Sequence, residues 1–93
     1  LKPPHEICDV AREVGIVRDL GDDFVAKARL RSQAEILDQA DLHYRWHWAA
    51  IELRLSGKRS DKLHEGIVRE RHRALNWLIR YMGQPWDDVA TDT

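Results

Sequence analysis

The clearest hydrophobic pattern lies in the middle of the chain, in a stretch that begins at Ser32. The four residues SQAE at positions 32–35 match a capping box, in which a serine and a glutamate satisfy free backbone N–H groups at a helix start. Good helix formers follow up to Ser56, with apolar residues at helical spacing, and Gly57 is typical of the position just after a helix. The pattern predicts a long helix over residues 33–56.

A second helical pattern covers residues 67–82. The polar loop GKRSDKLHEG precedes it, and it is followed by Gly83 and Pro85, two residue types that end helices. A short polar loop between two long helices makes them antiparallel neighbours. We therefore predict an all-α fold built on an antiparallel helical hairpin of residues 33–56 and 67–82.

The two ends of the chain have weaker patterns. Near the N-terminus, the apolar spacing predicts a short amphipathic helix that is stopped by Gly15. A second short helix is predicted at residues 24–31, with Asp22 or Asp23 as its N-cap. The last residues, WDDVATDT, predict an irregular tail anchored by Trp86. No sustained alternation and no hairpin-turn sequence predicts a strand.

Each long helix has two apolar stripes rather than one. In residues 33–56, one stripe consists of Leu37, Tyr44, Trp48, Ile51 and Leu55, and the other, on the nearly opposite face, of Leu42, Trp46, Ala49 and Leu53. A helix that rests on a single core has one stripe, so two stripes predict that the helix is covered on both sides. Two such helices and two short ones do not form a self-contained bundle. We therefore expect a dimer or a larger helical domain of which this chain is a part.

Length and composition limit the class of protein. The 93 residues suffice for one domain, so we treat residues 1–93 as a single helical domain or the C-terminal fragment of one, and the initial Leu1 favours a processed chain or a fragment. The apolar runs are too short for a membrane helix, and no segment matches a signal peptide. The single cysteine, Cys8, permits no intrachain disulfide, which predicts a cytoplasmic protein. The 15 basic and 16 acidic residues give no excess that would attract nucleic acid or an anionic membrane.

Four segments of the chain carry a family resemblance: LKPPHEICDV, RLRSQAEILDQADLHYRWHWA, IVRERHRALNWL and WDDVATDT. They resemble the domain-of-unknown-function family numbered 4272, in which an EILD..DL.YR.HWA helix, a V..ERH.ALNWL helix and a WDDV..DT tail follow in this order. The resemblance covers most of the chain and about the C-terminal half of the family's pattern. It implies a mostly α-helical, intracellular bacterial protein. It implies no assigned reaction, and hence no catalytic residue.

The nonapeptide DLHYRWHWA contains a candidate metal site. His43 and His47 are four residues apart, so both rings project from one side of the helix. A zinc site needs a third protein ligand, for which Glu70 and His72 are the candidates, although they point to nearly opposite sides of their own helix. Because the H-E-x-x-H pattern is absent, we favour partly exposed, hydrogen-bonded helix residues, and we expect no cofactor.

Charged residues fall among the apolar positions of both long helices, where an unpaired charge would be costly. If the hairpin folds about the loop near Asp61, Glu52 lies opposite Arg71, and Arg45 lies within reach of Asp41 by i,i+4 spacing. We therefore predict a buried or half-buried polar network of Asp41, Arg45, Glu52, Glu70 and Arg71. We favour a structural role, in which ion pairs fix the packing, over a site with shifted pKa values.

One face of the second long helix is basic and carries Arg69, Arg73, Asn76 and Arg80. Such a stripe suits phosphate or nucleic acid, whose binding weakens steeply as salt rises. Three arginines on a helix are more often a solvated face, helped near the C-terminus by the helix dipole. With a net charge of −1 we favour the solvated face, and nucleic-acid binding is the weakest of our alternatives.

Aromatic side chains form the last candidate cluster: Tyr44, Trp46, Trp48, Trp77, Tyr81 and Trp86. Aromatic residues are enriched in interfaces, but at helical spacing they more often belong to the core. We expect Trp86 to lie against the hairpin, with Asp87 or Asp88 bonded to the backbone or to an arginine.

The surplus of apolar helix faces gives the leading functional hypothesis, a non-enzymatic interaction or scaffold module. Its expected partner is a protein, either a second copy of the chain or the missing N-terminal segment of the family's pattern. The alternative is a helical hydrolase or ligand-binding protein with a site near His43, His47 and Glu70. No Gly-rich phosphate loop, G-x-S-x-G or Cys–His signature supports nucleophilic catalysis.

Overall fold

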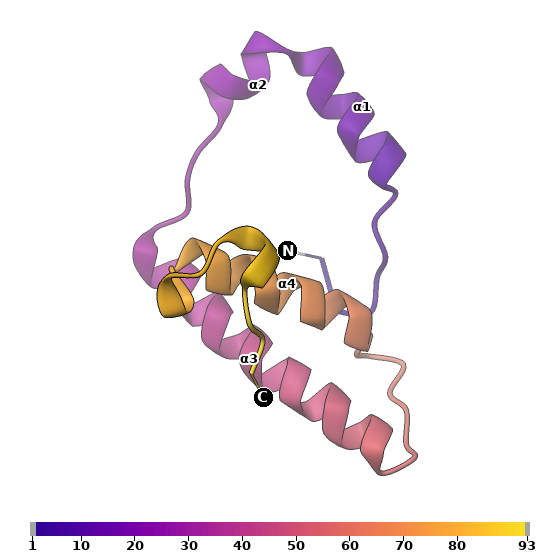
Figure 1. Cartoon of the computed structure of the whole chain (residues 1–93). Coiled ribbons are helices and arrows are strands. Elements are labelled where there is room, and N and C mark those ends of the chain that lie inside the picture. The colour runs from indigo at the N-terminus through magenta and orange to yellow at the C-terminus, as the bar shows by residue number, and fades with distance from the viewer. Residues whose placement is uncertain (1, 93) are drawn as a thin grey trace.

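The computed structural model describes residues 2–92 as helices joined by loops, without a strand in that range. Its elements are α1 (Val10–Leu20), α2 (Asp22–Lys27), α3 (Gln33–Leu55), α4 (Glu65–Leu78) and two 3-10 turns, η1 (Tyr81–Gly83) and η2 (Trp86–Asp88). The all-α prediction is confirmed. Figure 1 shows α3 and α4 side by side as the predicted antiparallel hairpin, with α1 and α2 as an arch set apart from it. None of the described helices is both long enough and apolar enough to cross a membrane.

Local sequence explains where α3 begins and ends. The Ser32 hydroxyl accepts a hydrogen bond from the backbone N–H of Glu35 over 3.2 Å and donates one to its carboxylate over 3.0 Å. At the other end, Gly57 has a φ of 73°, which a glycine adopts without strain. The N–H groups of this glycine and of the next residue bond to the carbonyls of Arg54 and Leu53. This Schellman motif ends α3 one residue before the predicted position.

The bounds of α4 differ from the prediction at both ends. The helix begins at Glu65, where the ring Nδ1 of His64 accepts a hydrogen bond from the third residue of the helix. It ends at Leu78 rather than at residue 82. Just beyond the helix, Arg80 adopts a left-handed conformation with a φ of 58°, and Met82 does the same two residues later. A non-glycine residue in this conformation costs about 1–2 kcal/mol, so the turn must be held by contacts beyond its local sequence.

The contact face between α3 and α4 is not one that the apolar stripes predict. The buried residues of α3 are Ala40, His43, His47 and Ala50, and those of α4 are Val68, His72 and Asn76. Small side chains let two helix axes approach closely, whereas large aromatic rings hold them apart. The stripe that contains Tyr44 and Trp48 therefore lies beside the interface, and about half of each of these side chains remains exposed.

The N-terminal helices also differ from the prediction. Helix α1 runs through Gly15, starting where the Asp9 carboxylate accepts the N–H of Arg12 over 3.1 Å. It ends at Gly21, whose φ is 53°, and α2 then covers residues 22–27 instead of 24–31. Apart from the half-buried Gly15, every residue of α1 and α2 is exposed, so the arch encloses no core of its own.

The whole molecule is elongated. Its principal extents are 48 × 30 × 24 Å and its radius of gyration is 15.2 Å, whereas a compact domain of this length has about 12 Å. The accessible surface is 7427 Å², compared with about 5,600 Å² for a compact protein of the same mass. The buried apolar residues in the described part of the chain are Ala40, Ala50 and Val68, so the hydrophobic core is small.

Candidate functional site

Three histidines meet at the centre of the hairpin. His43 and His47 come from α3, and His72 comes from the contact face of α4. These residues are 0%, 3% and 2% exposed, respectively. The prediction that His43 and His47 are partly exposed is wrong, because the flank that they share is the face that α3 presents to α4.

His47 and His72 face each other across the interface. Their Nδ1 atoms lie 3.0 Å apart, and the ring planes are nearly perpendicular, at 79°. A neutral imidazole has one protonated nitrogen, which donates, and one bare nitrogen, which accepts. One Nδ1 must therefore donate to the other, so the bond persists only while at least one of the two rings is neutral.

His43 has one satisfied ring nitrogen and one that is not. Its Nδ1 lies 2.8 Å from the backbone carbonyl oxygen of Gln39, and because a carbonyl only accepts, Nδ1 carries the proton. The Nε2 atom of the neutral ring is then an acceptor, and it is buried without a hydrogen-bond partner among residues 2–92. A buried acceptor in this state costs about 1–3 kcal/mol. The ring packs edge-on against Trp46, with 5.0 Å between the ring centres.

Burial lowers the pKa of all three rings. The pKa of His72 falls from 6.5 to about 4, first through burial and then through the nearby His47 and His43. Burial also lowers the pKa of His43, and the positive charge of Arg71 adds to this effect. The pKa of His47 is lowered by burial, which the negative charge of Glu65 partly opposes. The cluster is therefore neutral at neutral pH.

The structure does not assemble the candidate metal site of His43, His47 and Glu70. Glu70 is exposed, and its carboxylate lies 3.4 Å from the guanidinium of Arg69. Across residues 2–92, no three His, Cys, Asp or Glu side chains are placed to hold one metal ion. The hairpin instead joins the two histidines of α3 to His72. In the sequence, the signal for the position of His72 is its four-residue spacing from Val68 and from Asn76, which places all three on one face of α4.

The predicted buried polar network is not formed. Asp41 and Arg45 do pair, with 3.2 Å between carboxylate and guanidinium, but both side chains are more than half exposed. Glu52 and Glu70 are also exposed, and none of the ion pairs between described residues includes Glu52. Arg71 is half-buried and donates to the backbone carbonyl of Lys2 over 2.9 Å. The contact face is rotated away from these positions, so most of them point outward.

The C-terminal tail lies on the predicted arginine face of α4. Arg73 donates to the backbone carbonyl of Trp86 over 2.7 Å, and its guanidinium carbon lies 4.4 Å from the centre of the Trp86 ring. The buried Asn76 donates to the carbonyl of Ala90 over 2.9 Å, and Gln84 accepts the N–H of Ala90 over 3.0 Å. Trp86 thus lies against the hairpin, as expected.

The other expectations for this face are wrong. Within residues 2–92, the side chains of Asp87 and Asp88 make no hydrogen bond or ion pair, because Arg73 binds the main chain of the tail instead. The arginines do not form one exposed stripe either. Arg73 is half-buried beneath the tail, Arg69 pairs with its neighbour Glu70, and Arg80 lies beyond the end of α4.

The six aromatic residues divide into separate contacts. Trp77 and Trp86 pack edge-to-face with 5.8 Å between ring centres. Tyr44 packs on His72, at 5.6 Å between ring centres. Trp48 is 52% exposed. The predicted aromatic cluster is therefore split between the tail, the histidines and the outer surface.

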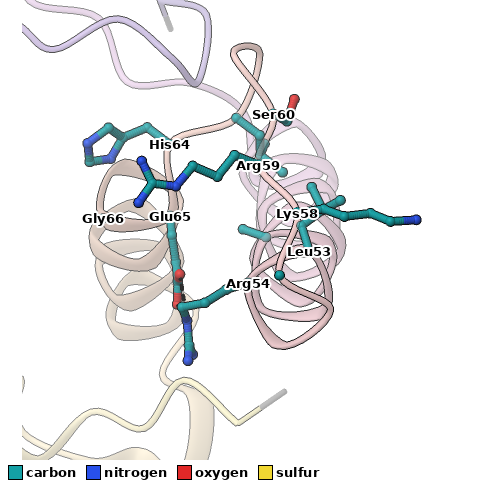
Figure 2. Close-up of a pocket in the computed structure, with 11 residues that line it drawn as sticks. Leu53, Arg54, Lys58, Arg59, Ser60, His64, Glu65 and Gly66 are labelled. Atoms are coloured by element: carbon teal, nitrogen blue, oxygen red, sulfur yellow. Dashed lines mark hydrogen bonds and ion pairs between the residues drawn. The ribbon is translucent and has the colours of Figure 1, made fainter.

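Two hollows lie near these residues. The first, of about 590 Å³, lies where α3 ends and α4 begins, and Figure 2 shows Arg54 and Glu65 pointing toward each other beside it. Their side chains pair over 2.9 Å, and Lys58 extends outward. None of the three clustered histidines lines this hollow.

The second hollow, of about 280 Å³, lies between α3 and the tail and is bordered by His72, Tyr44, Asp41, Tyr81 and Asp92. Its titratable groups are largely paired within the chain. The Tyr81 hydroxyl bonds to the Asp92 carboxylate over 3.2 Å, which raises the pKa of that tyrosine. His72 is bonded to its neighbouring histidine, and Asp41 is bonded to an arginine. This arrangement favours a structural role for these groups.

Comparison with known proteins places the chain in a family without an assigned reaction. No curated protein and no solved structure matches it. That the chain corresponds to the C-terminal half of the family's pattern stays a prediction. The family model described as Domain of unknown function (DUF4272) matches residues 1–89, and the chain therefore belongs to this family, as the resemblance of its helices and tail predicted.

Proposed function

We propose that the chain is a non-enzymatic interaction module whose apolar helix faces are completed by another polypeptide. The observation that carries this proposal is the exposure of large apolar side chains on every helix. Examples are Val14 on α1, Val25 on α2, Trp48 on α3 and Trp77 on α4. Single exposed apolar residues are ordinary, but apolar faces that extend over several helices are typical of interaction surfaces.

The amount of exposed surface supports the same proposal. The chain has 7427 Å² of accessible surface, about 1,800 Å² more than a compact protein of its mass. A standard protein–protein interface removes about 800 Å² from each partner. The excess is therefore large enough for an extensive contact with another folded segment.

The hairpin interior supports a need for such a contact. Its buried side chains are alanines, one valine, histidines and an asparagine. Full burial of a valine-sized side chain stabilises a fold by about 1.5–3 kcal/mol, and polar rings contribute less. Burial of the outer apolar faces by a partner would add the hydrophobic stabilisation that the interior does not provide.

We further propose a reducing, cytoplasmic setting in a bacterial cell. The lone Cys8 is exposed, and an exposed thiol tends to form intermolecular disulfides in oxidising compartments. The bacterial and intracellular setting is also what the family resemblance implies.

The test combines light scattering with binding of a hydrophobic dye across a dilution series. We expect the isolated chain to bind the dye when dilute, because its apolar faces are then uncovered, and to lose dye binding when a partner covers them. Guanidinium-unfolded chain is the control for dye binding that does not depend on folded helix faces. A globular monomer that binds no dye at any concentration would contradict the proposed function.

A further inference from the structure

One side of α3 carries an apolar seam, which we call the α3 seam: Leu37, Tyr44, Trp48, Ile51 and Leu55, with Asp41 between the first two. Leu37, Tyr44, Trp48 and Leu55 are 47%, 44%, 52% and 69% exposed, and Ile51 is half-buried. By helical geometry the seam lies about 100° around α3 from the face that contacts α4. Apart from the edge of the Tyr44 ring, which packs on His72, most of the seam surface therefore remains outside the hairpin contact.

The spacing of the seam is self-complementary. With Asp41 included, its positions are 37, 41, 44, 48, 51 and 55, and steps of four and three residues are typical of helices that pack side by side. The order of these steps is the same from either end of the helix. Two copies of α3 placed antiparallel about a two-fold axis near residue 46 therefore bring their seams into register.

We propose that the α3 seam binds a second copy of this chain, so that two hairpins form a four-helix bundle. The proposal rests on the proposed function, because it names the partner of the same apolar surface. In this arrangement Leu37 meets Leu55 of the second copy, and Tyr44 meets Trp48 of the second copy. The seam spans about 27 Å, and the excess exposed surface of the chain is about twice the 800 Å² that each partner of a standard interface buries.

The shape of the surface beside the seam fits this partner. The hollow of about 280 Å³ between α3 and the tail is lined by Leu37 and Tyr44. These residues lie toward the N-terminal end of α3, and the antiparallel register brings Leu55 of the second copy to this end. Leu55 is the most exposed seam residue, at 69%. It supplies an apolar side chain for a hollow that the chain itself leaves open.

The charges near the seam do not oppose pairing of two copies. The one charged residue within the seam is Asp41, and its carboxylate is bonded to Arg45 over 3.2 Å. On the wheel, Asp41 lies at the edge of the seam rather than at its centre. The whole chain has a net charge of only −1, so two copies repel each other weakly.

Analytical ultracentrifugation of the full chain over a wide concentration range tests the partner. We expect a reversible change from the chain mass of 10.9 kDa to twice that mass. The variants Trp48→Glu and Leu55→Glu should each raise the dimer dissociation constant about 30-fold or more, because they place a charge in the paired seam. Leu30→Glu is the matched control, since Leu30 is 99% exposed and lies outside the seam. Circular dichroism verifies that each variant keeps its helices.

Disulfide trapping tests the register. In a Cys8→Ser background, a mixture of the Leu37→Cys and Leu55→Cys variants should form a mixed disulfide faster than either variant pairs with itself. A parallel arrangement would instead favour pairing of Leu37→Cys with itself. That result would overturn the proposed register.

The outcomes separate this proposal from the proposed function. If the chain remains monomeric and binds the dye at every concentration, a second copy is not the partner of the α3 seam, and the proposed function as an interaction module is unaffected. If Trp48→Glu and Leu55→Glu do not weaken the dimer, the proposal that the α3 seam forms the contact is also overturned. The two chains then meet through another face. A compact monomer without dye binding overturns both proposals.

Discussion

At the scale of single residues, the three buried histidines differ in how well their ring nitrogens are satisfied. His47 and His72 supply a donor and an acceptor to each other over 3.0 Å. His43 has a partner for Nδ1 and none for its buried Nε2 among the described residues. The same residue type therefore stabilises the hairpin at one position and costs stability at another.

The pair and the unsatisfied ring predict substitutions of opposite sign. His43→Leu removes a buried, unpaired acceptor and should raise the free energy of unfolding by about 1 kcal/mol. His47→Leu leaves a His72 nitrogen unpaired and should lower it by about 1–3 kcal/mol. Urea unfolding followed by circular dichroism measures both. Equal destabilisation by the two variants would contradict the assignment of the unpaired Nε2.

The lowered histidine pKa values predict acid sensitivity. In the unfolded chain His72 takes up a proton near pH 6.5, but in the folded chain only near pH 4. Between these values the unfolded state binds more protons, so acid favours unfolding. From this residue alone we expect the free energy of unfolding to be about 2 kcal/mol lower at pH 5 than at pH 7.5.

The same unfolding experiment at several pH values measures this effect. His72→Phe should reduce the pH dependence by about 2 kcal/mol, and the lowered pKa values of His43 and His47 leave a remainder. His5→Gln, a change at an exposed histidine, is the control. A pH dependence in His72→Phe as large as that of the unchanged chain would contradict the lowered pKa of His72.

At the scale of the elements, two glycines of the N-terminal arch have opposite roles. Gly15 lies inside α1, and a Cβ there would meet only the Arg18 side chain at an ordinary 3.8 Å. Gly21 ends α1 with a φ of 53° and a ψ of −126°, a backbone conformation that residues with a side chain rarely adopt. One glycine weakens the helix, and the other shapes the turn after it.

These roles predict a matched pair of variants. Gly15→Ala should favour the helical form of α1 by about 1 kcal/mol, because alanine loses less backbone freedom on forming a helix. Gly21→Ala should cost about 1–2 kcal/mol, although no atom lies within 4 Å of the new Cβ, because the strain is conformational. Helix content by circular dichroism and amide exchange in α1 report both changes. A gain of helix in Gly21→Ala would contradict the described turn.

The sequence predicts which helices form and the bounds of α3, but it predicts the bounds of the other helices and the rotation of α3 against α4 poorly. The cap at Ser32 and the stop at Gly57 depend on a few adjacent residues, and these local signals place α3 within one residue. The apolar stripes mark where large side chains lie, but the closest approach of two helices is set by small ones such as Ala40 and Ala50. The end of α4 depends on a left-handed Arg80, which no local preference favours.

The candidate site shows the same limit. His43 and His47 lie on one flank of a helix because they are four residues apart. Their burial and the choice of His72 rather than Glu70 as the third member depend on how α4 is rotated against α3. That rotation depends on how the two helices pack against each other, and the apolar periodicity of either helix alone does not predict it.

At the scale of the whole molecule, the hairpin and the arch differ in how they are held. Helices α3 and α4 pack along their length, whereas α1 and α2 contact each other and stand away from the hairpin (Figure 1). Their residues are almost all exposed. Local stability should therefore be high in the hairpin and low in the arch.

Amide hydrogen exchange measures this difference. We expect the amides of Val10–Leu20 to exchange much faster than those in the central turns of α3, because every residue of the first helix except Gly15 is exposed. The exposed start of α3 near Ser32 serves as an internal reference for a frayed helix end. Protection of α1 equal to that of central α3 would show that the arch packs on the hairpin in solution.

The arch is tied to the hairpin at both ends, and this tether has a consequence for any competition over the apolar surface. A segment joined by short linkers has an effective concentration of about millimolar near its attachment points, whatever the amount of protein in solution. Closing of the arch onto the hairpin is thus independent of protein concentration, whereas pairing of two chains increases with it. In the structure the arch stands away from the hairpin, so dilution leaves the apolar faces of the single chain bare, whereas crowding of many copies covers them from outside.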